Sequence, residues 1–437
     1  MVLAHSIDRD IRLEKQYPPD LRNRVVGSRL QKEGKLPYTY FWQPADGIRY
    51  YDLNNTNFLG TGISNITASP FFHELLFPVC DLPQRTISRI WFCMEYMFLA
   101  CIIGMITSMT TNGQKKWLIF NIGILFTLTE AWKSLILTGQ LYFFLAFLTS
   151  CIFFLLYRNK KPGIFVAALL AVILVLARPI TIVLYIPFLF NFKRNLFFMS
   201  VSFTAFALYG LFVLTSTWER SLYQNYFSGM KMQLTIHQNV AMWDEPPVHS
   251  QRAHIYTNLE GFDLVEANRQ EKLYPIKVYS ENGNLFFLYH KITHKKMPVA
   301  VLNGLSIFTI FLLTSFYFFH IRKYPAHILQ ILLFGFALYM IVEFFAPFFR
   351  HQYYTVQWLP IVLIGFLLTP GWKNIIFLLL AAGLLLNILN LPWLFMRHTI
   401  GEFSWLTATI LLIFSKENLS ANSNGFTSSN VQPWKQL

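Results

Sequence analysis

The sequence predicts an all-α fold, a polytopic transmembrane helical bundle with about ten to eleven spanning helices and extracytoplasmic loops that carry short helices. Two observations carry this prediction. Of the 437 residues, 54% are hydrophobic and only 13% are charged, a balance that a soluble chain of this size has difficulty keeping in solution. The apolar residues are also gathered in runs long enough to cross about 30 Å of hydrocarbon.

The apolar runs give the expected spans. They cover residues 90–109, 117–137, 141–157, 164–190, 196–215, 299–319, 328–347, 354–368, 375–391 and 403–414. The region 164–190 is interrupted by Arg178-Pro179, which predicts two short helices that meet at a polar break.

The basic residues give the orientation. Lys and Arg gather in short loops at 115–116, 158–161, 193–194 and 322–323, at every second connection, and such loops are typically cytoplasmic. Crossing the region 164–190 twice keeps this alternation intact. The net charge of +14 is therefore interpreted as a topology signal, and no nucleic-acid partner is expected.

This topology divides the chain into five parts. They are an extracytoplasmic N-terminal segment with a candidate catalytic loop (1–87), a first transmembrane bundle (88–217), an extracytoplasmic loop or lid (218–297), a second transmembrane bundle (298–415) and a disordered cytoplasmic tail (416–437). The segment 1–87 has no spanning run although the charge pattern places it outside. Either a first spanning helix is missing upstream, or the segment reaches that side by another route.

Polar residues at one face of the predicted bundle are candidates for chemistry, because such residues are costly unless they pair or act. Asp20 follows Pro18-Pro19 and precedes a helix-prone stretch, so it suits a helix N-cap. A carboxylate near the membrane surface also suits a general base that takes a proton from an acceptor hydroxyl. The two interpretations are compatible.

Two arginines and a histidine are placed where helices break or emerge on that face. Arg350 and His351 suit the binding of a phosphate ester, or the snorkelling of side chains toward lipid headgroups. Arg178 suits the neutralisation of a phosphate, or simply fills the helix break.

The remaining candidates are uncharged or acidic. Gln140 opens a helix after Gly139, and His73-Glu74 is either part of the site or the outward side of an amphipathic interfacial helix. The four cysteines are scattered, and no metal-ligand spacing or Gly-rich phosphate loop is present. We therefore expect neither a metal nor a cofactor.

Several short motifs occur in an order that resembles a known family. They are Asp20, Gly27-Ser28, Gly34 and Pro37-Tyr38, then Ser69-Pro70-Phe71-Phe72 to Pro78, Gly139-Gln140, Arg178-Pro179, and Pro347 to His351 and Tyr353. From Asp20 to Trp393 the chain resembles the GT-C superfamily of membrane glycosyltransferases, and within it the polyprenol-phosphate-mannose-dependent α-mannosyltransferases, glycosyltransferase family 87. Members have a membrane helix before the Asp, which this chain lacks, and often Lys where it has Arg178.

The resemblance implies the transfer of a hexose, with mannose expected, from a polyprenyl-phosphate-linked donor to a lipid or glycan acceptor with inversion. Asp20 inherits the role of base, and His351 that of the donor-phosphate ligand. We add Arg350, Arg178, Gln140, His73 and Glu74 as substrate-binding residues. The expected partners are membrane lipid and these substrates, and the expected location is the bacterial inner or plasma membrane, part of the cell envelope, with an extracytoplasmic active site.

Two other functions are compatible with the sequence. A transporter or flippase of a lipid-linked or polar solute would also be polytopic, although no internal repeat is visible. A non-catalytic membrane scaffold is the third possibility, and the convergent Asp, Arg and His residues count weakly against it.

Overall fold

The computed structural model describes residues 1–52, 66–190, 192–240, 256–273, 283–324, 326–347, 350–369, 371–389, 391 and 393–415. Within these ranges nearly all regular structure is helical, and the strands form one two-stranded antiparallel hairpin. The predicted all-α class is therefore confirmed. The predicted C-terminal tail, 416–437, lies outside the described residues.

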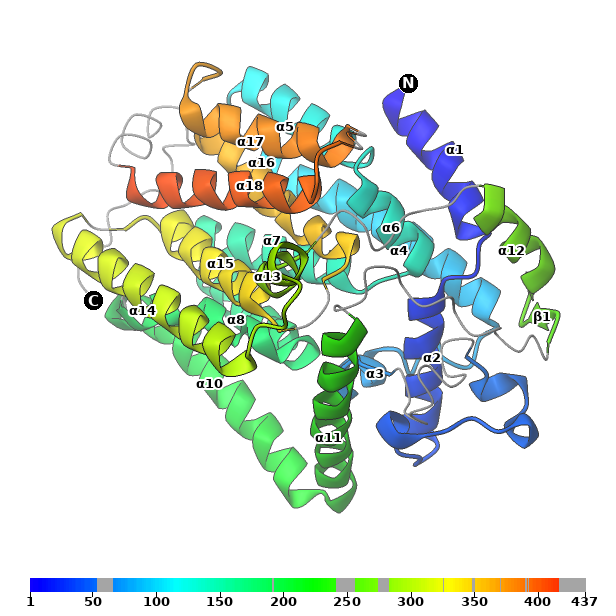
Figure 1. Ribbon diagram of the computed structural model, residues 1–437. Coiled ribbons are helices and arrows are strands. Elements are labelled where there is room, and N and C mark those ends of the chain that lie inside the picture. Colours follow the sequence, from blue (N-terminus) through cyan, green and yellow to red (C-terminus); the bar gives the residue numbers. More distant parts are fainter. Residues whose placement is uncertain are drawn as a thin grey trace.

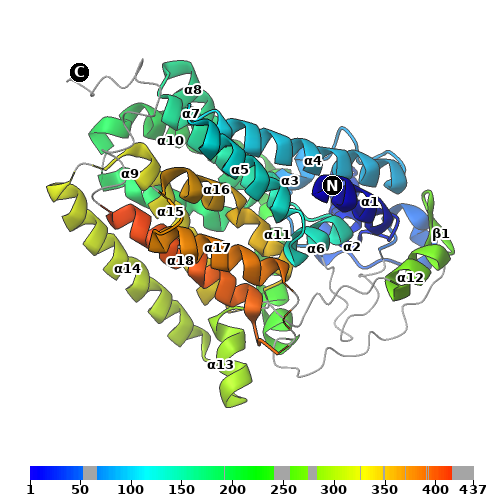
Figure 2. The ribbon, with the colours of Figure 1, turned by 90° about the horizontal axis from the view of Figure 1, so that it is seen from above.

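The N-terminal part of the chain, up to α3, folds beside the bundle. In Figure 1, α1, α2, α12 and the strand β1 lie on one side of the molecule, and Figure 2 shows the same grouping from above. The elements of this part are α1 (Val2–Glu14), α2 (Pro19–Lys32), the 3-10 helices η1 (Pro37–Thr39), η2 (Pro44–Asp46) and η3 (Ile48–Tyr50), and α3 (Pro70–Leu75).

The bundle begins with α4. Its first half consists of α4 (Gln84–Thr107), α5 (Gly113–Phe126), α6 (Glu130–Thr138), α7 (Tyr142–Arg158), α8 (Lys161–Ala177), η6 (Pro179–Tyr185), α9 (Ile186–Phe190) and α10 (Phe192–Thr215). Its second half consists of α14 (Val299–Lys323), α15 (Ile328–Phe345), η7 (Gln352–Trp358), α16 (Leu359–Leu368), α17 (Ile375–Ile388) and α18 (Arg397–Phe414). As predicted, a helix ends at Arg178-Pro179, because Pro179 cannot continue the hydrogen-bonding of α8.

Between the two halves lies the segment that the sequence predicts as a loop or lid. It contains α11 (Thr217–Val240), β1 (Asn258–Leu259), β2 (Phe262–Asp263), α12 (Leu264–Leu273) and α13 (Leu285–Thr293). Helix α11 packs on η1 and α3, so part of this segment covers the N-terminal part of the chain.

Fewer helices than expected have the length of a full span. Among the described residues, four are long and apolar enough to cross a membrane: α4, the part Asn195–Thr215 of α10, α14 and α15. A fifth span results if α5 and α6, which meet at an angle of 57°, are taken as one. The other apolar runs form shorter helices, such as Tyr142–Arg158 with 17 residues, which reach only about 25 Å.

Polar contacts fix α1 on the bundle. The buried carboxylate of Asp10 accepts hydrogen bonds from the Tyr96 hydroxyl and the Trp132 indole N–H, both at 2.7 Å. The hydroxyl groups of Ser6 and Thr127 lie 2.8 Å apart. Because buried polar groups must be hydrogen-bonded, these contacts hold α1 against α4 and α6 and so fix the approach of the chain to α2.

Candidate active site

Helix α2 carries two polar faces. Pro19 and Asp20 occupy its first turn, and every residue from Leu21 to Gln31 is buried. At 100° per residue, Asp20, Arg24, Gly27 and Gln31 fall on one face, whereas Arg22 and Arg29 fall on the opposite face. A helix this polar is stable in a buried position because each face meets its own polar partners.

The first face holds the predicted base. Gln140 donates a hydrogen bond from Nε2 to the Asp20 carboxylate and accepts one at Oε1 from Arg24. Arg24 also donates from Nη1 to the backbone carbonyl of Asp20 at 2.6 Å. Gly139 is left-handed, with φ of 66°, and a Cβ there would lie 2.6 Å from the Cβ of Leu21. The Gly-Gln pair therefore lets the α6–α7 connection approach α2 closely enough to hold Asp20.

Asp20 has the electrostatic properties of a base. Burial raises its pKa to about 6, and the Asp52 carboxylate adds to the increase, whereas Arg24 and the hydrogen bond from Gln140 oppose it. A carboxyl group with this pKa is ionised at pH 7 and takes up a proton more readily than an ordinary aspartate. Arg24 is a member of the site that the sequence did not identify, and its only signal is its position one helical turn after Asp20.

His351 lies at the end of a stack of aromatic rings, here called the column, formed with Tyr353 and Tyr142. The His351 ring stacks on Tyr353 with centroids 4.9 Å apart, and Tyr353 stacks on Tyr142 at 5.5 Å. The charges of Asp20 and Arg24 both act on the Tyr353 hydroxyl. Asp20 and His351, which are more than 300 residues apart in the sequence, are thus linked through Tyr353: His351 stacks on its ring, and Asp20 is close enough for its charge to act on the hydroxyl.

Arg178 contacts Tyr142, the ring at the other end of the column from His351. Its guanidinium group lies 4.9 Å from the centroid of the Tyr142 ring and donates a hydrogen bond to the Tyr142 hydroxyl at 3.0 Å. It also forms an ion pair with the buried Glu343 at 2.5 Å and bonds to the Tyr339 hydroxyl at 3.1 Å. Arg178 therefore lies beside the column, but its charge is already matched by Glu343.

Arg350 is placed differently from its neighbour. Its side chain is 1% exposed and pairs with the equally buried Glu402 at 2.7 Å. Glu402 also accepts hydrogen bonds from Thr355 and from the Trp358 indole. This network ties the start of η7 to α18 and accounts for Arg350 without any ligand, so the structure favours a role in folding over the predicted phosphate contact.

His73 and Glu74 lie on α3, against the first face of α2. The His73 ring is fully buried, and a Cβ at Gly27 would lie 2.5 Å from its Nε2. Burial, with a further contribution from Arg24, lowers the pKa of His73 to about 3, so the imidazole is neutral at pH 7. The Glu74 side chain accepts a hydrogen bond from Gln31 at 3.2 Å. The interpretation of this pair as the outward side of an interfacial helix is therefore wrong for His73, which faces inward.

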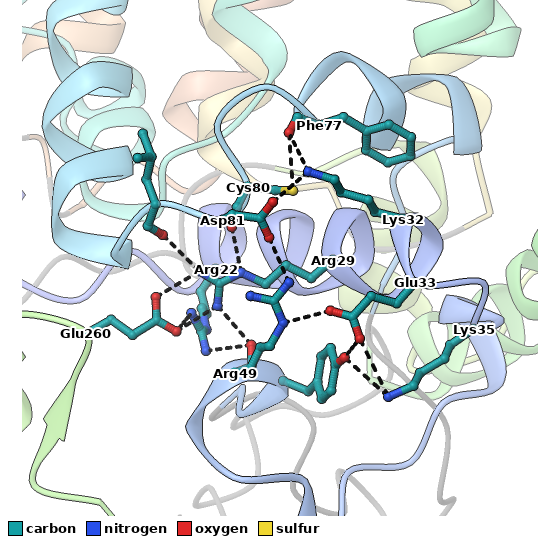
Figure 3. Close-up of polar contacts among 12 residues, drawn as sticks. Arg22, Arg29, Lys32, Glu33, Lys35, Arg49, Phe77, Cys80, Asp81 and Glu260 are labelled. Atoms are coloured by element: carbon teal, nitrogen blue, oxygen red, sulfur yellow. Dashed lines mark hydrogen bonds and ion pairs between the residues drawn. The ribbon is translucent and has the colours of Figure 1, made fainter.

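The second face of α2 is neutralised by the hairpin. Arg29 contacts both carboxylate oxygens of Glu260 at 2.6 and 2.8 Å, and Arg22 contacts Oε1 at 2.9 Å (Figure 3). The same arginines donate to backbone carbonyls of Arg49 and Tyr51, among others. Glu260 thus holds α2 and the segment after it in one position.

Metal ligands are not grouped in the described part of the chain. No set of three or more His, Cys, Asp or Glu side chains there is placed to hold a metal ion. The candidate site consists instead of one carboxylate, one amide, two guanidinium groups and several tyrosine and histidine rings.

The fold and the site together define a multi-pass membrane protein with a candidate general base held between its N-terminal part and its helical bundle. Residues 67–264 match the family model of glycosyltransferase family 87. The match agrees with the resemblance drawn from the motifs over 198 of the 437 residues, and it supports a membrane glycosyltransferase. Searches of curated proteins and of solved structures found no significant match.

The matched range includes some of the candidate residues and not others. His73, Glu74, Gln140 and Arg178 lie within it, whereas Asp20 and the residues around His351 lie outside. The grouping of Asp20 with His351 rests on the geometry described above.

Proposed function

We propose that the protein transfers a hexose, with mannose as the expected sugar, from a polyprenyl-phosphate donor to a lipid or glycan acceptor. The reaction takes place on the extracytoplasmic side of a bacterial inner or plasma membrane and inverts the anomeric centre. The observation that carries the proposal is the position of the Asp20 carboxylate, which accepts a hydrogen bond from Gln140 and lies close enough for its charge to act on Tyr353, the ring on which His351 stacks.

The proposed reaction is a single displacement. The acceptor hydroxyl gives its proton to Asp20 while its oxygen attacks the anomeric carbon of the donor sugar. The bond between that carbon and the phosphate oxygen breaks, and the polyprenyl phosphate leaves with the electron pair. His351 binds the donor phosphate, and a hydrogen bond from its imidazole to the leaving group stabilises the charge that develops there.

The residues beside Asp20 have separate roles in this proposal. Gln140 is a positioning residue because it donates to the Asp20 carboxylate, and Arg24 is one because it donates to Gln140 and to the Asp20 backbone carbonyl. Arg178 orients Tyr142, and through it the rings of Tyr353 and His351, because its own charge is matched by Glu343. No metal or cofactor is assigned a role.

The test compares Asp20→Asn with Asp8→Asn in the full chain, reconstituted in lipid with a radiolabelled polyprenyl-phosphate mannose and a membrane extract as acceptor. Asp8 is an exposed carboxylate on α1, with 64% of its side chain accessible. We expect Asp20→Asn to reduce transfer by about 10²-fold or more, the usual contribution of a general base, and Asp8→Asn to leave it unchanged. Full transfer by Asp20→Asn would refute the assignment.

His351→Ala is the companion variant. Loss of a phosphate ligand should raise the KM for the donor more than it lowers kcat, whereas disruption of the base should lower kcat. An unchanged donor KM would remove His351 from the proposed site. Inactivity of the wild-type chain with mannose, together with activity on another polyprenyl-phosphate hexose, would correct the sugar alone.

A further inference from the structure

A second polar cluster lies where α3, α10 and α11 meet. It consists of Glu74 on α3, Tyr209 near the end of α10, and Glu219 and Tyr223 on α11. Helix α11 packs on α3 and on α10, and this packing brings the four side chains together. The reaction proposed above makes no use of them.

The two tyrosines form a hydrogen-bonded pair with aromatic surroundings. Their hydroxyl groups lie 2.9 Å apart, and the Phe71 ring packs edge-on against Tyr209 with centroids 5.7 Å apart. The charges of Glu74 and Glu219 act on both hydroxyl groups. All four groups therefore face a common region.

The two carboxylates are poorly compensated. Glu219 is 9% exposed, and among the described residues its buried Oε2 has no hydrogen-bond partner. Burial and the negative charge of Glu219 raise the pKa of Glu74 to about 7, and burial raises the pKa of Glu219. Among the described residues, no Lys or Arg lowers the pKa of either carboxyl group. Two acidic groups in this position, one of them without a partner, cost free energy unless something donates hydrogen bonds to them.

Helix capping explains only part of this arrangement. Ser216 and Glu219 have the spacing of a capping box, and the Ser216 hydroxyl accepts a hydrogen bond from the backbone N–H of Glu219 at 3.2 Å. Capping accounts for the position of Glu219 at the start of α11. It does not account for the buried Oε2 or for the second carboxylate opposite it.

We propose that this cluster binds a sugar of the acceptor, at a distance from the hydroxyl that reacts. Carboxylate oxygens accept strong hydrogen bonds from hydroxyl groups, and tyrosine rings offer an apolar surface with a polar edge. A sugar presents several hydroxyl groups that can donate to the carboxylates, and an apolar face that can pack on the tyrosine rings. This inference rests on the proposed function, because it takes the bound molecule to be the acceptor.

The position of the cluster fits an acceptor that carries several sugars. Gln31, which bonds to Glu74, follows Asp20 by eleven residues on the same face of α2, and the two are therefore separated by about 16 Å along the helix axis. Tyr209 belongs to the apolar part of α10, Asn195–Thr215, and Glu219 follows its end. The cluster therefore lies at the end of a candidate membrane span, where the glycan of a lipid-linked acceptor would emerge.

The test measures binding without transfer. Octyl glycosides of one hexose and of linear tetrasaccharides of mannose, glucose and galactose are titrated against the full chain in lipid nanodiscs. We expect at least one tetrasaccharide to bind more tightly than its monosaccharide, and Glu219→Gln to weaken that tetrasaccharide by about tenfold, the effect of losing a hydrogen bond to a charged group. Affinity for the monosaccharide should not change.

Two further variants control the result. Tyr223→Phe removes one hydroxyl with little risk to folding and should produce a smaller loss, and Glu266→Gln, at an exposed position on α12, should produce none. If no tetrasaccharide binds the wild-type chain more tightly than the monosaccharide, or if Glu219→Gln weakens both ligands equally, the subsite is refuted. Binding that survives in Asp20→Asn separates this outcome from a failure of the proposed transfer.

Discussion

Replacing Glu260 with glutamine should destabilise the N-terminal part of the protein, because it leaves Arg22 and Arg29 buried without a counterion. The side chains of both arginines are at most 2% exposed, and that of Glu260 is 14% exposed. The four contacts of the carboxylate, including one from the backbone N–H of Gln84 at 2.9 Å, are replaced by those of a neutral amide with a single acceptor oxygen. Glu260 also adopts a positive φ of 46°, which is uncommon for a residue other than glycine and marks a position determined by its contacts.

The loss of stability expected for Glu260→Gln follows from the lowered pKa of Glu260. Burial alone would raise the pKa of Glu260, but the hydrogen bonds and charges of Arg29 and Arg22 outweigh it and lower the pKa from 4.5 to about 2. Since one pKa unit corresponds to about 1.4 kcal/mol, the ionised carboxylate contributes about 3 kcal/mol at pH 7. This agrees with the cost of about 3–5 kcal/mol for removing one partner of a buried ion pair.

The sign of the pH dependence follows from the lowered pKa. The contribution is fully present above the unfolded-state pKa of about 4.5 and is lost as the pH falls toward about 2. The wild type and Glu260→Gln should therefore differ most near pH 7 and converge in acid. The assay is the free energy of unfolding in detergent, followed by denaturant titration.

Glu266→Gln is the matched control, because Glu266 pairs with Arg269 at 3.5 Å on the surface of α12, where both side chains are exposed. Such a pair contributes at most about 1 kcal/mol. Equal stability of Glu260→Gln and Glu266→Gln at pH 7 would show that Glu260 does not hold α2 in place.

Three further changes test other parts of the site. If Asp20 is the base, transfer should fall about tenfold per pH unit below about pH 6, the pKa of its carboxyl group; a rate profile that stays flat down to pH 5 would contradict this. Gly27→Ala places a Cβ 2.5 Å from His73 Nε2 and should cost about 1–3 kcal/mol of stability by overpacking, measured by thermal unfolding; unchanged stability would mean that α2 and α3 separate easily. Arg350→Met should cost about 3–5 kcal/mol because it leaves Glu402 buried and unpaired, and adding Glu402→Gln should restore much of it; no recovery in this double-mutant cycle would mean that Arg350 has another role.

The local elements could be predicted because their signals are local. Apolar runs of sufficient length predict helices whatever surrounds them, and Arg178-Pro179 ends α8 because proline lacks the N–H that a helix requires. Gly139 was identified as part of a motif, and its left-handed backbone explains why glycine is required there. The number of full spans could not be predicted in the same way, because hydropathy does not show where a run is divided into shorter helices.

The partners of the charged side chains depended on tertiary structure. Arg350 and His351 are adjacent in the sequence and were predicted to act together, yet one pairs with Glu402 and the other stacks on Tyr353. Likewise, nothing local to Arg29 indicates Glu260, which is 231 residues away.

The sequence by itself predicted the all-α membrane class, most helices of the bundle and the resemblance to a glycosyltransferase family, because composition, hydropathy and short motifs are properties of the chain alone. Only the tertiary structure decided which polar groups share a site and which neutralise one another. The physical reason is that a buried charge must find its counterpart within a few ångströms, and the chain can bring that counterpart from any distance along the sequence.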